Sequence, residues 1–419
     1  IPNPQSPIPN PQSPINYNKI SAFIFFKLIN NFNMNGKKKK KTIRKKKEES
    51  NLDLTKFKPP LEKEESNNNE ETKEKIKEKH ILKTDNDIID DYINKVNKNN
   101  EKVIYDFTDC LFFSKYKVTK KISEGNFSKI YQLTDINTDE IYACKIEHKK
   151  AEQPMLEYEY KVIDYLRGDY IPSIKLYGSS GDYNVLIMQL LGKSLDYYIK
   201  KLEVFSIHTT AMIAYQIINI LQYIHIRGIV HRDIKPGNFV MGLGLKNLDL
   251  YMIDFGFAKK YKSMTSLKIY PLTENHELTG TSRYASINAM KGLSQSCRDD
   301  LESLAYMLYF FLKGRLPWMG IKEKTKENLD KKILEKKEET VDEILGKDLP
   351  IQFYEFLTYS KKLKYDEVPD YNLFKTKMME VICLGGKTYD KIYDWTDVNK
   401  LKKEEEPVIE KAICSCCKM

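Results

Sequence analysis

The sequence predicts an α+β fold of two lobes, in which a strand-rich lobe precedes a helical lobe and a low-complexity arm precedes both. Three observations support this prediction. From Tyr116 the chain has short β-type runs between polar turns, KYKVTKKI, KIYQLTD and IYACKIE, which indicate an antiparallel sheet. After Ser206 the apolar residues recur at helical spacing, as in 210–226 and 301–312. From residue 36 to 100, Lys, Glu and Asn dominate and apolar residues are scattered.

The chain of 419 residues is expected to consist of four parts. Residues 1–113 form the arm, which we expect to be disordered because its apolar residues are too few to repay the entropy of ordering a backbone. The strand-rich lobe and the segment that connects it to the helical lobe occupy 114–191, and the helical lobe occupies 192–400. Residues 401–419 form a charged tail with a cluster of cysteines.

The arm begins with a tandem repeat, IPNPQSP, and with Ile1 instead of a methionine. We expect residues 1–33 to be untranslated and Met34 to be the true start. A basic run, KKKKKTIRKKK, follows this methionine. It is a candidate nuclear localisation signal or contact with acidic lipid, and a solvated charge run is an equal alternative.

Composition restricts the cell compartments and the classes of partner that are expected. The net charge of +10 suits nucleic acid, acidic lipid or acidic protein substrates. Nucleic acid is not expected as a partner, because the sequence has no zinc-finger spacing, aromatic–basic strand motif or basic zipper. The 7 cysteines, an odd number, lack the spacing of a secreted disulfide scaffold, and the apolar stretch 20–32 is interrupted by Lys27. We therefore expect an intracellular, cytoplasmic protein, with the nucleus as the alternative.

Two motifs in the helical lobe carry the residue types that phosphoryl transfer from ATP requires. These are metal-binding oxygens, a cation on the phosphates and a base beside the acceptor hydroxyl. In VHRDIKPGNF, Asp233 is the candidate base and Lys235 can reach the γ-phosphate. Asn238 in the same motif and Asp254 in IDFG are the candidate Mg²⁺ ligands. The two motifs in this order and spacing are typical of protein kinases, whereas Asp233 alone would be a turn or cap carboxylate.

The strand-rich lobe supplies the residues expected around the nucleotide. Lys145 in YACKIE lies on a predicted strand, where it would hold the α- and β-phosphates, and Ala143 on the same strand is a further candidate ATP contact. The partner of Lys145 should be a helix glutamate, for which MLEYEYKVI offers Glu157 and Glu159. Glu159 is preferred from the family resemblance given below, and Glu157 would then be solvated. In a chain this rich in Lys and Glu, any single Lys or Glu is usually a surface residue.

The loop expected to cover the phosphates departs from the glycine-rich pattern. KKISEGNFSKIY has Ser123, Gly125 and Ser128 where such a loop has three glycines. Serine amides can still face phosphate oxygens, but their Cβ atoms restrict φ and limit close approach. Phe127 at the tip would either shield the site from water or be an ordinary hairpin aromatic.

Further motifs make the chain resemble the casein kinase 1 family of protein Ser/Thr kinases. They are RYASIN, CRDDLESLAYML, LPWMGIK, EVPDY and YDWT, and with the motifs above they extend from Tyr116 to Trp395, about two-thirds of the chain. The family replaces the usual APE element of kinases with the tripeptide SIN, residues 286–288 here. The resemblance implies the two-lobed protein kinase fold and transfer of the γ-phosphoryl group of ATP, with Mg²⁺, to Ser or Thr of a protein.

The same resemblance implies an adenine site. Met188 would be the gatekeeper, and Gln189 and Leu191 would bind adenine through backbone groups. Asp300 would brace the catalytic loop from a central helix. Apolar residues such as Met188 and Leu191 are otherwise usually plain core.

The resemblance also implies acidic or already phosphorylated protein substrates, held by an anion site. The residues that match this site are Arg232, Lys259, His276, Arg283 and Gly320. His276 stands where the family usually has Lys, and Leu329 stands where another anion-contacting Lys is expected. A neutral His and a Leu attract phosphate less than lysines do, so a preference for acidic substrates is expected to survive better than priming by phosphate.

Activity has a competing interpretation. The divergent phosphate loop fits a pseudokinase or scaffold that binds nucleotide with little turnover, whereas the retained catalytic motifs favour an active enzyme. The resemblance implies activity without phosphorylation of the activation segment, in which Thr279, Thr281 and Ser282 are interpreted as structural turn residues.

The tail cysteines are candidates for membrane attachment. Cys414, Cys416 and Cys417 lie close to the last residue, beside Lys411 and Lys418. S-acylation of two or three of them would bury enough acyl chain for stable attachment. Prenylation, a zinc site and free cysteines without a role are the alternatives.

Overall fold

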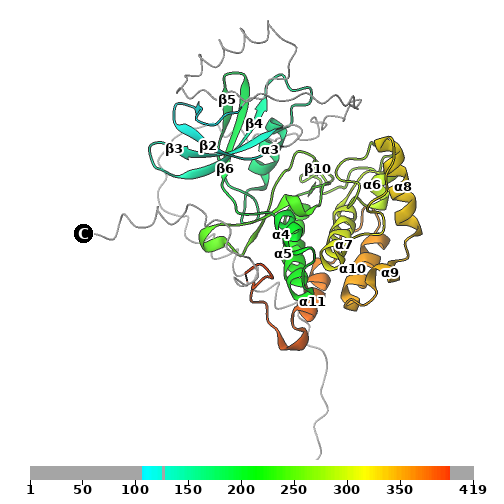
Figure 1. The fold of residues 1–419 in the computed structure, drawn as a ribbon. Helices are drawn as coiled ribbons and strands as arrows, with labels where there is room; N and C mark the ends of the chain where they lie inside the picture. The colour runs from blue at the N-terminus through cyan, green and yellow to red at the C-terminus, as the bar shows by residue number, and fades with distance from the viewer. Residues whose placement is uncertain (1–105, 125–127, 397–419) are drawn as a thin grey trace, which may run out of the picture. The chain divides into compact units, whose positions relative to one another are not determined.

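The structure, a computed structural model, describes residues 106–124 and 128–396 (Figure 1). Most of the predicted arm and tail, including the tail cysteines, lies outside the described residues, as do Gly125 and Phe127 of the phosphate loop. The described residues confirm the predicted α+β fold, in which a strand-rich lobe precedes a helical one. Within these two ranges, no helix is long and apolar enough to cross a membrane.

Among the residues that the structure describes, the strand-rich lobe has an antiparallel sheet of 6 strands in the order β1-β2-β3-β4-β6-β5. Along β3, buried Tyr131 and Leu133 alternate with less buried residues, as expected of a strand with one face on a core. These side chains pack with Val118, Cys144 and Ile187 from neighbouring strands. The strands are β1 (Leu111–Phe112), β2 (Tyr116–Glu124), β3 (Lys129–Asp135), β4 (Ile141–His148), β5 (Ile174–Ser180) and β6 (Tyr183–Gln189).

The sheet begins before the boundary expected at residue 114. β1 pairs with β2 in antiparallel register. Phe107 and Phe112 are each 5% exposed, and the ring of Phe107 lies edge-on to Tyr131 with the centroids 5.7 Å apart. A strand of 2 residues is too short to show an alternating pattern, so only its packing reveals it.

In the described part of the strand-rich lobe, the helix α3 (Leu156–Leu166) packs against the sheet (Figure 1). Its start is fixed by Glu147 of β4, whose carboxylate is 3% exposed. That carboxylate accepts hydrogen bonds from the backbone N–H groups of Met155, at 2.7 Å, and Leu156, at 3.1 Å. A side chain of the sheet thereby satisfies the free donors at the helix start and sets where α3 lies on the sheet.

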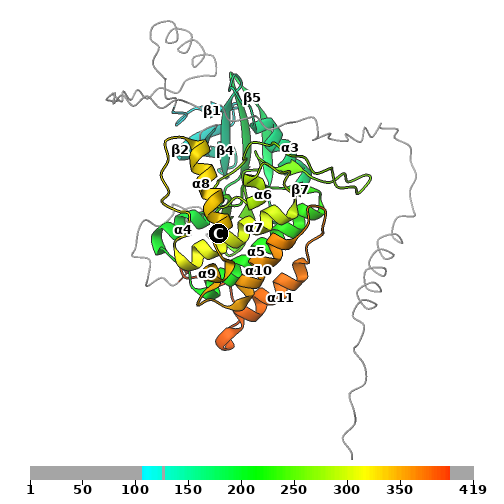
Figure 2. The same ribbon diagram turned by 90° about the vertical axis from the view of Figure 1, so that its right-hand side faces the viewer.

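The helical lobe is organised around α5 (Ile207–Ile226), which packs against both α7 and α11 (Figure 2). α5 is buried almost without interruption from Thr209 to Leu221, as is typical of a helix enclosed by others. The other helices are α4 (Leu195–Leu202), α6 (Ile287–Met290), α7 (Cys297–Lys313), α8 (Lys326–Glu339), α9 (Asp342–Gly346), α10 (Ile351–Lys362) and α11 (Tyr371–Ile382). The lobe also has the short strands β7 (Ile229–Val230), β8 (Phe239–Met241), β9 (Leu250–Met252) and β10 (Lys259–Lys260), with a 3-10 turn, η2 (Pro236–Asn238).

Local sequence explains where the two central helices begin and end. The Ser206 hydroxyl accepts from the Thr209 N–H at 3.1 Å and starts α5. A capping box of Ser296 and Asp299 starts α7. Gly314, with φ at 67°, ends α7 in the left-handed conformation that glycine adopts at little cost.

The YDWT segment belongs to the helical lobe. The Asp394 carboxylate accepts from the Ser206 N–H at 2.6 Å. The Trp395 ring, 7% exposed, stacks on Tyr198 with the centroids 4.3 Å apart. This contact ties the last described residues to the starts of α4 and α5.

Candidate active site

Two short antiparallel sheets, each of two strands, bring the HRD and DFG motifs together. β7 pairs with β10, and β8 pairs with β9. The HRD segment runs from β7 to β8 and the DFG segment runs from β9 to β10, so each two-stranded sheet joins one end of the HRD segment to one end of the DFG segment. Between them, the Ile253 N–H donates to the carbonyl oxygen of Asn238 at 3.0 Å. The two candidate metal ligands, Asn238 and Asp254, thus lie on neighbouring segments of the chain.

Asp300 on α7 fixes the backbone of the HRD segment. Its carboxylate, 1% exposed, accepts from the N–H groups of His231 at 2.8 Å and Arg232 at 2.9 Å. The Nε2 atom of His225 lies 2.9 Å from the same carboxylate. Burial opposes ionisation of Asp300, but the bond from His225 and its charge outweigh this and lower the carboxyl pKa. The anchored backbone holds Arg232 at a φ of 70°.

Asp233 is oriented from several sides. Its carboxylate is 3% exposed and accepts from the Thr281 hydroxyl at 2.9 Å. The Lys235 ammonium lies 2.5 Å from the other carboxylate oxygen. The Asn238 amide nitrogen donates to the Asp233 carbonyl at 2.8 Å and to the carboxylate at 3.1 Å. A carboxylate held this firmly beside a cation suits a base that must meet a substrate hydroxyl in one orientation.

Lys145 joins the two lobes. Its ammonium on β4 lies 2.6 Å from the Glu159 carboxylate on α3 and 3.1 Å from the Asp254 carboxylate of the DFG motif. Glu159 is 2% exposed, whereas Glu157 on the same helix is exposed and pairs with Lys161. The structure therefore brings Glu159, and not Glu157, to Lys145.

The charges around Asp254 suit a metal ion and a polyphosphate. The nearby Lys145 ammonium lowers the pKa of Asp254, which keeps this carboxyl ionised even though burial opposes it. Lys145 contacts Oδ1 of Asp254, which leaves Oδ2 for another ligand. The amide nitrogen of Asn238 is used by Asp233, so its amide oxygen is the atom suited to a cation. Asp254 has a φ of 64°, an unusual backbone conformation for a residue that is not glycine.

The residues expected at adenine lie at the end of β6. Met188 pairs with Ala143 across β4 and β6, and it packs partly buried against the main core. The Gln189 N–H donates to the Ser173 carbonyl at 2.9 Å, so this N–H is already used within the protein. Leu191 follows directly after the strand and is half-buried.

The phosphate loop is described only at its two ends. Ser123 lies on β2 and pairs with Ile130, and Ser128 directly precedes β3. The next pair, Glu124 with Lys129, closes the described part of the hairpin. Gly125 at the turn lies outside the described residues.

Two residues at the catalytic centre, Thr281 and Gly280, were not among the site residues expected from the sequence. Thr281, interpreted as a turn residue, donates its hydroxyl hydrogen to Asp233. A Cβ on Gly280, whose φ is 95°, would lie 2.4 Å from the Arg232 carbonyl, so this glycine lets the activation segment approach the catalytic loop. Their position just before the RYASIN motif was a signal, but the direction in which they point needs the tertiary structure.

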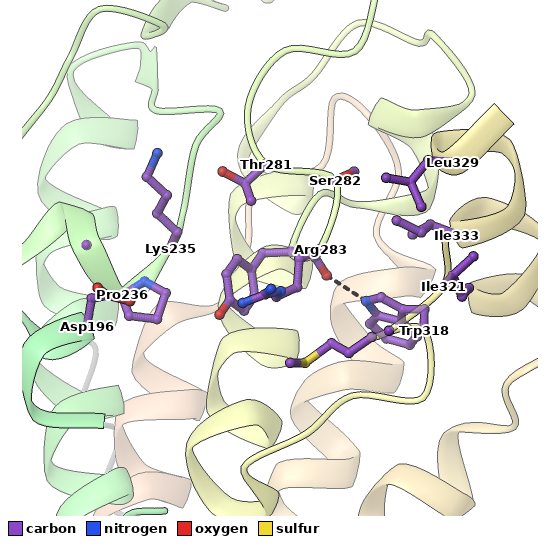
Figure 3. A pocket seen from close by; sticks show the side chains of 14 residues that line it. Asp196, Lys235, Pro236, Thr281, Ser282, Arg283, Trp318, Ile321, Leu329 and Ile333 are labelled. Carbon is purple, nitrogen blue, oxygen red and sulfur yellow. Dashed lines mark hydrogen bonds between the residues drawn. The ribbon is translucent and has the colours of Figure 1, made fainter. Parts of the chain in front are cut away.

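A pocket of about 470 Å³ lies beside Asp233 (Figure 3). Lys235 and Thr281, which both contact Asp233, are part of its lining. The remaining lining comes from α4, the turn η2, the segment 282–284, the loop that follows α7, and α8. Those residues are Asp196, Pro236, Gly237, Ser282, Arg283, Tyr284, Trp318, Met319, Gly320, Ile321, Leu329 and Ile333.

The expected anion residues fall into two groups. Arg283 and Gly320 line the pocket. Lys259 and Arg232 act together on His276, whose pKa is lowered by partial burial and by these two cations. The Arg232 guanidinium also donates to the Phe257 carbonyl at 2.7 Å, and burial lowers its pKa to about 10. The structure thus does not gather all five residues around the pocket.

A protein kinase domain model matches residues 116–365, which is more than half of the chain. The chain belongs to the protein kinase domain family. The family accounts for the two lobes, for the Lys145–Glu159 pair within the strand-rich lobe and for the two-stranded sheets that join the HRD and DFG segments. This kinase domain implies ATP as the phosphoryl donor and typically Mg²⁺.

The residues of the site fit both ATP and Mg²⁺. Lys145 offers an ammonium to phosphate oxygens, and Asp254 and Asn238 offer the carboxylate and amide oxygens that Mg²⁺ prefers.

Proposed function

We propose that the chain is an active Ser/Thr kinase of the casein kinase 1 type, which transfers the γ-phosphoryl group of ATP to Ser or Thr in acidic or already phosphorylated proteins. The observation that carries this proposal is the set of bonds around Asp233. Its carboxylate is 2.9 Å from Thr281 and 2.5 Å from Lys235, which is the environment of a base beside a group that stabilises transferred charge.

In this mechanism Asp233 accepts the proton of the substrate hydroxyl as its oxygen bonds to the γ-phosphorus. The bond from that phosphorus to the bridging oxygen of ADP breaks, and ADP leaves. Lys235, already beside Asp233, neutralises charge on the moving phosphoryl group. Lys145 orients the phosphates, and Asn238 and Asp254 would hold Mg²⁺, which supplies further charge neutralisation when bound.

The cations near this site favour a substrate that is negatively charged. Arg232 and Lys259 both act on His276, and Arg283 lines the pocket beside Lys235. A protein segment that bears carboxylates near the acceptor would be attracted to this side of the catalytic centre.

The test is transfer of radiolabelled γ-phosphate to casein and to a matched pair of acidic peptides, one primed with phosphoserine. Phosphoamino-acid analysis of the product identifies Ser or Thr. We expect Asp233→Asn to lower the rate by roughly 10²- to 10⁴-fold, the usual contribution of a general base, with Asp254→Asn as a metal-site control. A folded wild-type protein that binds nucleotide but labels no substrate would instead favour the pseudokinase interpretation, for which the serines at 123 and 128 are the motivating feature.

A further inference from the structure

The pocket beside Asp233 is continuous with the catalytic centre. Lys235 and Thr281 line it, and both contact the Asp233 carboxylate. An extended peptide advances about 3.3 Å per residue, so a substrate with its hydroxyl at Asp233 carries neighbouring residues into this pocket within a few positions. The lining of the pocket is therefore a determinant of which flanking side chains are accepted.

The two ends of the pocket differ in chemistry (Figure 3). Lys235 and Asp196 lie at one end, and Arg283 lies in the middle. At the other end the side chains of Leu329 and Ile333 from α8 face the loop that follows α7. The apolar lining residues are Trp318, Met319, Ile321, Leu329 and Ile333, which we call the apolar end.

The charged lining residues in the described part of the chain already have partners or lie outside the apolar end. Asp196 pairs with Lys200 at 2.7 Å, and Lys235 pairs with Asp233. The Arg283 guanidinium lies 5.9 Å from the Tyr284 ring centroid. Outside the lining, the Arg315 guanidinium donates to the Met319 carbonyl at 3.4 Å. A phosphate or carboxylate beside Leu329 and Ile333 would lose its hydration without a charged lining residue next to it.

The wall of the apolar end is preformed. The Trp318 indole N–H donates to the Arg283 carbonyl at 2.7 Å, and Trp318 is 2% exposed. Behind it, the Lys337 ammonium is 5.0 Å from the Trp318 ring and donates to the Ser282 carbonyl at 2.8 Å. Lys337 is 1% exposed, so its ammonium lies behind the pocket wall and does not contact a ligand in the pocket. Because these contacts already hold the wall in place, a ligand that binds against it loses little free energy to the ordering of protein side chains.

We propose that the apolar end of this pocket binds an apolar side chain of the protein substrate, close in sequence to the phosphorylated residue, and that Leu329 determines this selection. The inference rests on the proposed kinase function and names its substrate class more closely. Acidic residues of the same substrate face Arg283 and the cations around His276, while the side chain at the apolar end displaces water from Leu329, Ile333 and Trp318.

The test uses full-length protein and a set of acidic peptides with one acceptor serine. Each flanking position is occupied in turn by Leu, Ala, Asp or phosphoserine, and kcat/KM is measured for each peptide. At one position or two adjacent ones we expect Leu to exceed Asp and phosphoserine by about tenfold or more, the size of discrimination that an apolar subsite achieves. The preference should fall in Leu329→Ala, and Leu329→Lys should shift it towards phosphoserine. Leu334→Lys, the same change on α8 outside the pocket lining, should keep the wild-type preference.

The outcomes separate the two proposals. If the wild-type protein labels casein but prefers Leu at no position, the apolar subsite alone is overturned. The same holds if the wild-type protein prefers phosphoserine and Leu329→Lys leaves that preference unchanged. A folded wild-type protein that labels neither casein nor any peptide overturns the proposed function, and the subsite with it. Thermal unfolding of each variant checks the fold, and Leu329→Ala, which adds no charge, keeps the test decisive if Leu329→Lys does not fold.

Discussion

The ammonium group of Lys337 on α8 lies 2.8 Å from the carbonyl oxygen of Ser282, and it lies 2.5 Å from the carbonyl oxygen of Ala285. These two carbonyls flank Arg283 in the segment that forms one wall of the pocket beside Asp233. Lys337 therefore holds the backbone of this pocket wall, and we expect it to be a positioning residue that acts through this segment and not by contact with the reacting atoms.

Replacement of Lys337 should weaken the use of protein substrate more than the use of ATP. In Lys337→Met two carbonyls lose their donor, at a cost of about 1–3 kcal/mol for each buried group left without a partner. We expect KM for an acidic peptide to rise by roughly tenfold while KM for ATP stays within about twofold of the wild type. Lys336→Met is the matched control, since Lys336 is 47% exposed and pairs with Glu339. Equal changes of both KM values in Lys337→Met would contradict the positioning role.

Glu159 and Glu157 provide a paired test of the nucleotide site on one helix. Glu159→Gln removes the charge that lies 2.6 Å from Lys145, and we expect kcat/KM for ATP to fall by roughly 10²-fold because the ammonium loses its alignment. Glu157→Gln, which breaks only an exposed pair with Lys161, should change it little. A steady-state ATP titration decides, and similar losses in the two variants would refute the assignment.

His276 should make the use of acidic substrates depend on pH. Partial burial and the charges of Lys259 and Arg232 lower the pKa of His276 below its usual value, so the ring is neutral at pH 7. As pH falls through that lowered pKa, below about 6.5, the ring gains a positive charge. We expect KM for an acidic peptide to decrease over this range by roughly two- to fivefold, the size of an exposed ion pair. The change should be absent with a neutral peptide and in His276→Gln.

Activity should not require phosphorylation of the activation segment. The Thr281 hydroxyl already donates to Asp233, and its carbonyl accepts from the Tyr284 N–H at 2.9 Å. A phosphate on Thr281 would place negative charge against the catalytic carboxylate. Phosphatase-treated protein should retain its rate on an acidic peptide, and Thr281→Glu should lose at least about 10²-fold in kcat. A large loss after phosphatase treatment, restored by an added kinase, would be inconsistent with this expectation.

The tail cysteines lie outside the described residues, and membrane attachment through them stays a prediction. We expect the protein with Cys414, Cys416 and Cys417 to fractionate with membranes in eukaryotic cells, and hydroxylamine to release it by cleaving thioesters. The variant with all three changed to Ser should be in the soluble fraction. Membrane binding that resists hydroxylamine would indicate prenylation, and a wholly soluble wild-type protein would exclude an anchor.

The fold and the catalytic motifs were predictable because their signals are local. β3 and β4 coincide with KIYQLTD and IYACKIE, and the candidate base and metal ligands lie within two short motifs. Helical spacing alone could also have separated Glu159 from Glu157. Leu156, Glu159, Ile163 and Leu166 recur every three or four residues along α3 and are all buried, so they share its inner face.

Contacts between distant segments were not predictable in the same way. Lys337 is one of many lysines in KENLDKKILEKKEE, and the side chain of its neighbour Lys336 is 47% exposed. Only the packing of α8 against Trp318 and the segment 282–285 distinguishes it. Gly280 likewise has a meaning only because the Arg232 carbonyl lies where a Cβ would be. The casein kinase 1 subfamily and the anion site depended on resemblance and remain predictions.

The positive φ angles of Arg232 and Asp254, 70° and 64°, have a consequence for how this protein could evolve. A non-glycine residue in this conformation costs of order 1–2 kcal/mol. Selection for thermal robustness alone would therefore favour glycine at both positions. The chain instead keeps an arginine whose guanidinium donates to the Phe257 carbonyl and an aspartate that Lys145 contacts. Its catalytic centre is thus a compromise between robustness and turnover, and heat tolerance would have to be gained elsewhere in the chain.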